Sequence, residues 1–244
     1  MALYPALYQI NPRCMTDRKR PAWSGRFFCA VILPTFGSMY LIQTPRLLRA
    51  LGPSVAEWQM PADPIAPAVY LTFDDGPHPV ATPFVLDQLA KYDAKGTFFC
   101  IGKNVVEYPA LYDRILEEGH TTGNHTHSHL KGWVTKTKDY IENTVQAAQF
   151  IDSKLFRPPY GRIKRMQAAQ LHQLGYRIIM WSLLSADFDT ALDPVRCLEN
   201  VVFHLKPGDI VVFHDSQKAW DRMSYALPKV LEHCRKNKWA VKSL

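Results

Sequence analysis

Residues 68–79 read AVYLTFDDGPHP, and the fold prediction starts from this stretch. The apolar and β-prone run 68–73 is typical of a buried strand, and Asp74 and Asp75 stand side by side where that strand ends. A carboxylate is costly to bury without a partner, so two adjacent acids at this place indicate a chemical role. Gly76–Pro77 also favours a turn, and a solvated turn is the alternative interpretation of the same residues.

Downstream of this stretch, apolar runs alternate with helical patterns. The expected strands cover residues 68–73, 96–102, 120–125, 154–158, 176–183, 209–214 and 239–244. The expected helices cover residues 83–91, 106–118, 138–153, 164–174, 195–205 and 219–236. This order predicts an α/β domain built from parallel βα units. The pattern alone allows either a closed barrel or an open, doubly wound sheet.

Ionisable residues follow several of the expected strands at the point where each strand ends. They are Asp74, Asp75, His125, Arg157, Asp187, His214 and Asp215. The carboxyl ends of parallel strands share one face of such a fold, and ligands bind there. We therefore expect these side chains to lie close together at the end of the fold where the strands finish.

The segment GNHTHSH (residues 123–129) adds a candidate metal site. His125 and His129 are four residues apart, so on a helical turn their rings would face the same way, whereas His127 would point elsewhere. Two imidazoles and one carboxylate from the FDDG segment would leave open coordination positions, a set that suits Zn²⁺, Co²⁺ or non-haem Fe²⁺. The alternative is a polar loop with solvated histidines.

Composition narrows the class of protein. The net charge is +7, and residues 1–66 carry +4 of it (seven Lys and Arg against three Asp and Glu). No basic stripe interleaved with aromatic residues is present, so nucleic acid is not an expected partner. The five cysteines include no CxxC pair, which argues against a disulfide framework or a cysteine zinc site.

The N-terminal flank is expected to be distinct from the catalytic part. Residues 27–45 carry no charge and approach the length of a membrane span, but they contain Pro34, Gly37, Gln43 and Pro45. Two hypotheses remain: a membrane-associated segment, or a start at Met39 followed by a short amphipathic helix within residues 40–52. We predict a flank over residues 1–66 and a catalytic domain over residues 67–244.

Four motifs in this order, TFDDGP, NHTHSH, RPPYG and VVFHD, resemble those of the polysaccharide deacetylase family, carbohydrate esterase family 4. The likeness covers residues 68–244. It implies a distorted seven-stranded (β/α) barrel and a metal-dependent hydrolase that removes acetyl groups from N-acetylated or O-acetylated sugars. It also implies one divalent metal, with Zn²⁺ favoured over Co²⁺ and other ions.

The resemblance also assigns roles to individual residues. It implies that the metal is held by Asp75, His125 and His129. It implies that water is activated by the metal and by Asp74 as base, and that Arg157 pairs with this base. The backbone N–H of Tyr160 matches an oxyanion donor, and His214, oriented by Asp187, matches the acid that protonates the leaving group. Further substrate contacts are expected at Pro158, Phe188 and Val212.

The sequence departs from the family pattern at Leu184, where many relatives carry an acid, and at Phe188, where they carry Trp. These departures concern the substrate rather than the catalytic set. An acetylated glycan or oligosaccharide is the expected partner, with a monomeric state and a cytoplasmic location favoured over a membrane-anchored or cell-envelope one. The alternatives are a hydrolase of non-sugar amide bonds, an iron oxygenase and a non-catalytic sugar-binding protein.

Overall fold

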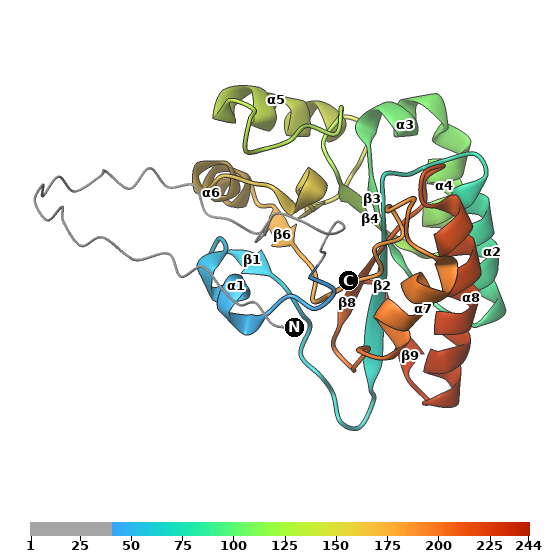
Figure 1. Cartoon of the computed structure of the whole chain (residues 1–244). Helices are drawn as coiled ribbons and strands as arrows, with labels where there is room; N and C mark the ends of the chain where they lie inside the picture. The colour runs from blue at the N-terminus through green and yellow to red at the C-terminus, as the bar shows by residue number, and fades with distance from the viewer. Residues whose placement is uncertain (1–40) are drawn as a thin grey trace, which may run out of the picture.

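The computed structural model describes residues 41–244 of the chain. A curled sheet, whose strands pair in parallel, carries helices along its outer face (Figure 1). The strands are β1 (Ala56–Glu57), β2 (Ala68–Asp74), β3 (Thr97–Cys100), β4 (Thr121–Asn124), β5 (Leu155–Phe156), β6 (Arg177–Ile179), β7 (Leu183–Leu184), β8 (Ile210–His214) and β9 (Ala240–Val241). The parallel pairing confirms the prediction of βα units.

The helices lie close to their predicted positions. They are α1 (Arg46–Leu51), α2 (Ala81–Lys91), α3 (Gly102–Glu107), α4 (Pro109–Glu117), α5 (Thr137–Ala147), α6 (Arg165–Gln173), α7 (Pro194–Val202) and α8 (Trp220–Lys236). The prediction of a single helix over residues 106–118 is wrong. Pro109 has no N–H to continue a helix and keeps Tyr108 out of the helical region (φ −127°, ψ 58°), so α3 ends and α4 begins there.

The predicted strand over residues 176–183 is also wrong as one element. The chain leaves the strand conformation between β6 and β7, because β6 pairs with β5 whereas β7 pairs with β8. Since the sheet order runs β1-β6-β5-β4-β3-β2-β8-β7, this short stretch of chain passes from one end of the sheet to the other. The sheet therefore curls round until its two ends meet at residues 177–184.

Residues 42–57 complete this closure. The Leu184 N–H donates to the Ile42 carbonyl at 2.9 Å, and the Thr44 N–H donates to the Ser182 carbonyl at 3.0 Å. After α1, strand β1 pairs in parallel with β6. This strand was not predicted, because two residues are too few to give a periodic pattern. The boundary at residue 66 stays a prediction, but part of the expected flank hydrogen-bonds to both ends of the sheet.

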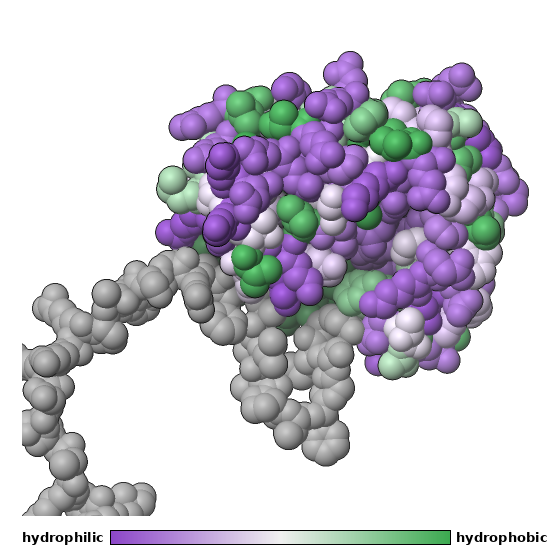
Figure 2. All heavy atoms as spheres, turned by 90° about the horizontal axis from the view of Figure 1, so that it is seen from above, coloured by the Kyte–Doolittle hydropathy of each residue, from purple (hydrophilic) through white to green (hydrophobic). Residues whose placement is uncertain are grey.

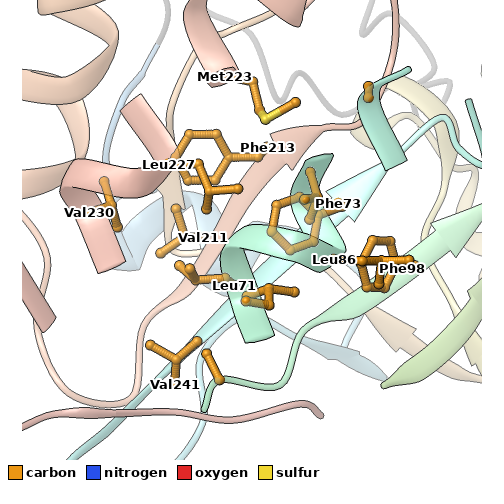
Figure 3. Close-up of a cluster of buried hydrophobic side chains, with 14 of the residues drawn as sticks. Leu71, Phe73, Leu86, Phe98, Val211, Phe213, Met223, Leu227, Val230 and Val241 are labelled. Atoms are coloured by element: carbon orange, nitrogen blue, oxygen red, sulfur yellow. The ribbon is translucent and has the colours of Figure 1, made fainter. Parts of the chain in front are cut away.

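The alternation of side chains along β2 and β8 separates a packed core from the interior of the barrel. Leu71 and Phe73 of β2, with Val211 and Phe213 of β8, point towards the helices and pack with residues of α2 and α8 (Figure 3). The Phe73 ring stacks on Phe98 at 5.0 Å between ring centroids. Since successive residues of a strand face opposite ways, residues 72, 74, 212 and 214 face the interior.

The described residues include no helix that is both long and apolar enough to cross a membrane. Most of the segment proposed as membrane-associated lies in residues 1–40, outside the described part of the chain, and that hypothesis stays open with the choice of start site. Helix α1 lies within the range predicted for a short helix.

The closure by residues 42–57 yields a prediction about truncation. A chain that begins at Met39 should fold with the stability of the full chain, whereas one that begins at Pro67 loses its partners at both ends of the sheet. It also loses Trp58, which is 8% exposed, and loss of a buried aromatic side chain costs about 3–5 kcal/mol. Urea unfolding of the three chains measures the difference, and equal free energies of unfolding for the two truncated chains would contradict the closing role.

Candidate active site

The predicted strand ends do converge. Strands β2, β4, β5 and β8 finish at the same edge of the sheet, the upper one in Figure 1, so their carboxyl-terminal residues share one face. Figure 2 looks down on the molecule from this side and shows a surface on which hydrophilic residues predominate and apolar ones lie in separate groups.

The Arg157 side chain occupies the interior directly beneath this face. It is fully buried, and its Nη1 donates to Asp74 Oδ1 at 2.7 Å and to Thr72 Oγ1 at 2.6 Å. Nη2 donates to the Met180 carbonyl at 3.0 Å, Nε donates to the Ile179 carbonyl at 3.3 Å, and the guanidinium lies 4.1 Å from the Phe99 ring centroid. This set of contacts fixes the direction of the Asp74 carboxylate and places a positive charge beside it.

The two histidines of the candidate metal site come together by a route that the sequence did not predict. Residues 125–129 form an irregular loop, so the expected helical turn is wrong. Thr126 and His129 adopt left-handed backbone conformations (φ 64° and 54°), and the rings of His125 and His129 lie 5.1 Å apart. His127 points elsewhere, as predicted, with its ring 6.1 Å from that of Phe150.

The Asp75 carboxylate joins the histidine pair. Its Oδ1 lies 3.1 Å from His129 Nε2 and 3.6 Å from His125 Nε2, yet this buried oxygen has no hydrogen-bond partner among the described residues. Burial by itself favours the neutral acid, but the neighbouring imidazoles of His129, His214 and His125 lower the pKa of Asp75 well below its usual range. An ionised, unpartnered oxygen beside two imidazole nitrogens fits a bound cation.

The protonation of His125 fits the same interpretation. Burial lowers its pKa to about 4, so the ring is neutral at pH 7. Its Nδ1 lies 2.8 Å from the Arg157 carbonyl oxygen, which can only accept a hydrogen bond, so Nδ1 carries the proton. The lone pair is then on Nε2, which faces Asp75. A neutral imidazole and an ionised carboxylate are the forms that bind a divalent metal.

His214 forms a second pair with Asp187, in which Asp187 is fully buried and the His214 side chain is 15% exposed. His214 Nδ1 lies 2.7 Å from Asp187 Oδ1, and the His214 backbone N–H donates to Oδ2 at 2.7 Å. Burial opposes the charged imidazole, but Asp187, through its charge and hydrogen bond, raises the pKa of His214 to about 10, with smaller contributions from Asp75 and Asp74. His214 is therefore protonated at pH 7 and can donate a proton.

The two pairs are placed by strand register. Asp74 and His214 are directly paired positions of the neighbouring parallel strands β2 and β8. Gly76 follows the two acids, and a Cβ there would come 2.0 Å from Asp215 Oδ2, so only glycine allows this approach. Thr82 Oγ1 donates to the same Asp215 oxygen. The turn after β2 therefore packs against the side chain of Asp215, the residue that follows His214.

The remaining predicted contacts border this centre. Tyr160 has a left-handed backbone (φ 59°) in a single 3-10 turn, Pro159–Gly161, that follows Pro158, and its ring lies 4.6 Å from that of His129. The Phe188 ring meets the His214 ring edge-on at 5.4 Å. Val212 is buried two residues before His214 on the same side of β8. Their roles towards a substrate stay predictions.

Sequence reasoning missed residues that support the site. Thr72 accepts a hydrogen bond from Arg157, and Arg222 Nε donates to the Asp187 carbonyl at 2.7 Å. The position of Thr72, two residues before Asp74 on the same face, was the one signal available for it. A cavity of about 730 Å³ lies at the opposite end of the sheet, beside β9, and none of the predicted site residues lines it.

Comparisons with known proteins show which family this chain resembles. A family model described as polysaccharide deacetylase matches residues 62–179. A peptidoglycan-N-acetylglucosamine deacetylase of Bacillus cereus is 35% identical over 185 residues, which cover 73% of this chain and 86% of the relative. A chitooligosaccharide deacetylase of Azorhizobium caulinodans is 31% identical over 156 residues, which cover 61% of this chain and 73% of the relative.

Solved structures show the same architecture. A crystal structure of a peptidoglycan N-acetylglucosamine deacetylase superposes with a TM-score of 0.75 at 26% identity and covers 82% of this chain and 95% of that one. The predicted distorted (β/α) barrel is thereby confirmed. The similarity in sequence and the curled parallel sheet both identify the family that the motifs resemble. The chain belongs to the polysaccharide deacetylase family, carbohydrate esterase family 4.

Proposed function

We propose that this deacetylase hydrolyses the amide bond of an N-acetylated sugar, with Asp74 as general base and His214 as general acid. The observation that carries the proposal is the register of β2 and β8, which places Asp74 directly opposite His214. Each of the two has its own buried partner, Arg157 at 2.7 Å and Asp187 at 2.7 Å. A negative base and a positive acid are thus held on adjacent strands, about 4.8 Å apart.

The base acts on water. Arg157 fixes the direction of the Asp74 carboxylate, and Asp74 is proposed to take a proton from a water molecule as the water oxygen attacks the acetyl carbon. The backbone N–H of Tyr160 is proposed to stabilise the negative charge that develops on the carbonyl oxygen. Its left-handed conformation sets the direction of this N–H.

The acid completes the reaction. When the C–N bond breaks, His214 donates its proton to the departing nitrogen, which leaves as an amine while the acetyl group leaves as acetate. Asp187 holds the imidazole by Nδ1, so the proton to be donated is on Nε2. The raised pKa of His214 keeps this proton in place at neutral pH.

A divalent metal, with Zn²⁺ favoured, is proposed to bind at Asp75, His125 and His129, whose ligand atoms all lie within 4.8 Å of one another. When bound, such a metal supplies Lewis acidity that makes a water more acidic and polarises the acetyl carbonyl. Asp74 and Asp75 thereby have separate tasks, one as base and the other as ligand.

The proposed substrate is an acetylated glycan such as the peptidoglycan or chitooligosaccharide named for the relatives. Acetate release from acetylated oligosaccharides, with and without added Zn²⁺, tests the activity. Ring opening of a cyclic amide without acetate release would instead support the alternative of a non-sugar amide hydrolase.

Substitution of the adjacent acids should separate metal binding from turnover. Asp75→Asn, His125→Ala and His129→Ala should lose the metal, because each removes one ligand. Asp74→Asn should keep the metal and lower kcat by about 100- to 10,000-fold, because an amide cannot accept a proton from water. Elemental analysis and acetate release measure the two effects.

His127→Gln is the matched control, since His127 belongs to the same loop but points away from Asp75. It should keep both the metal and the activity. Loss of the metal from Asp74→Asn together with its retention in Asp75→Asn would show that the two acids have the opposite roles.

The pH–rate profile should report the His214–Asp187 pair. His214 acts as an acid only while it is protonated, so activity should fall as the pH rises through its pKa of about 10. Asp187→Asn removes the negative charge that raises this pKa, so the alkaline limb should move to lower pH, towards the ordinary histidine value near 6.5. An unchanged alkaline limb in an Asp187→Asn enzyme that retains its metal would exclude His214 as the group that titrates there.

A further inference from the structure

Two lysines stand at opposite sides of the proposed site. Lys131 follows the histidine loop, and its Nζ lies 4.9 Å from the centroid of the Tyr160 ring. Lys218 follows β8, and its Nζ lies 6.0 Å from the centroid of the Phe188 ring. In the sheet order, β2, which ends in Asp74, lies between β4 and β8, so the two lysines follow strands on different sides of it.

Each lysine reaches the centre through one aromatic ring. The Tyr160 ring, 52% exposed, contacts His129 at 4.6 Å and has Lys131 over it. The Phe188 ring contacts His214 at 5.4 Å and has Lys218 over it. Attraction between an ammonium group and an aromatic face holds each charge at the rim and not at an arbitrary point in solvent.

The two charges are not neutralised by the protein. Lys131 and Lys218 are both exposed, and neither forms an ion pair within residues 41–244. Other lysines of the described chain do, for example Lys138 with Glu142 and Lys236 with Glu232. Two carboxylates inside the site have their own cationic partners, since Asp74 pairs with Arg157 and Asp187 pairs with His214, and the third, Asp75, lies against His125 and His129.

We propose that Lys131 and Lys218 make this site selective for a glycan that carries negatively charged groups on the sugars beside the acetylated one. The inference rests on the proposed function and adds the charge of the substrate to it. A sugar chain that crosses the mouth from the Tyr160 side to the Phe188 side passes both ammonium groups. Anionic substituents would be attracted there, whereas a neutral chain would gain nothing from the two charges.

The test compares two substrates that differ in charge and otherwise only by the methyl groups of the ester. One is a tetrasaccharide in which N-acetylglucosamine alternates with N-acetylmuramic acid, whose lactyl groups carry carboxylates, and the other is its methyl ester. The wild-type enzyme should show a higher kcat/KM for the acid than for the ester. An exposed ion pair contributes about 0.2–1 kcal/mol, so each lysine should account for up to about fivefold of this ratio, mainly through KM.

The variants are Lys131→Gln, Lys218→Gln and the double substitution. The single variants should reduce the acid-to-ester ratio, and the double variant should bring it close to one. The preference should also vanish as ionic strength rises from about 0.01 M to about 1 M, since the Debye length shortens from roughly 30 Å to 3 Å.

Lys154→Gln is the matched control. Lys154 also lies over a tyrosine ring, 5.0 Å from the centroid of Tyr176, but it precedes β5 and so belongs to the opposite end of the sheet. This variant should keep the wild-type ratio at every salt concentration.

A wild-type ratio of one, or a ratio that survives in the double variant, would overturn the proposal. Calorimetric binding of both tetrasaccharides to the Asp74→Asn protein measures the charge selectivity separately from turnover. If neither tetrasaccharide releases acetate but the acid binds more tightly than the ester in a manner that depends on the two lysines, the proposed reaction fails while the charge selectivity stands. If both release acetate equally well and bind equally well, the charge selectivity fails alone.

Discussion

The buried ion pair between Arg157 and Asp74 is the interaction on which the rest of the site depends. Arg157 is fully buried, and its guanidinium donates to two carbonyls, one hydroxyl and the Asp74 carboxylate, so its donors bind β2, β5 and the β6–β7 connection together inside the barrel. Such a pair adds little net stability, because the cost of removing both charges from water offsets their attraction. Loss of one partner is different: it leaves a lone buried charge and costs about 3–5 kcal/mol. The pair is therefore best explained by what it does for Asp74, whose carboxylate it fixes in direction beside a positive charge.

The register of β2 and β8 determines which side chains face the interior beside this pair. Along β2 and β8 the residues that face the helices are apolar and pack as in Figure 3, while the alternate residues face the interior and end in Asp74 and His214. A shift of one strand by one residue against the other would turn its ionisable group towards the helices. The packing of Phe73 and Phe213 therefore holds Asp74 and His214, the proposed base and acid, in position as well as stabilising the sheet. The partners Arg157 and Asp187 come from other strand ends, so each charge is balanced by a residue distant in sequence.

Much of the fold and of the candidate site could be predicted from the sequence. The physical reasons for this also explain which predictions were wrong. Strands β2, β3 and β8 are apolar runs with clear ends, so the pattern of residues was enough to place their carboxyl-terminal residues on one face. The closure could not be predicted, since β1 and β7 are two residues each and depend on hydrogen bonds from residues 42–57. The proximity of His125 and His129 was expected for the wrong reason. A helical turn was expected to bring the two rings together, but a loop with left-handed residues does so. Arg222 gave no signal, because its side chain donates to backbone carbonyls, which every residue carries.

The backbone of the turn after β2 accounts for the two adjacent acids. Asp74 is the last residue of the strand and points into the interior, where Arg157 binds it, whereas Asp75 takes a left-handed conformation (φ 78°) that turns its carboxylate towards the histidines. A non-glycine residue rarely adopts this conformation unless its surroundings enforce it. Here Asn104 donates to the Asp75 carbonyl at 2.7 Å, and the Asp215 carboxyl packs against Gly76. Burial raises the pKa of Asp215 to about 8, so this carboxyl is mainly neutral at pH 7 and does not add a third negative charge beside the pair. Two neighbouring carboxylates can thus share one small site because the backbone sends them in different directions, one to an arginine and the other to a place fitted for a cation.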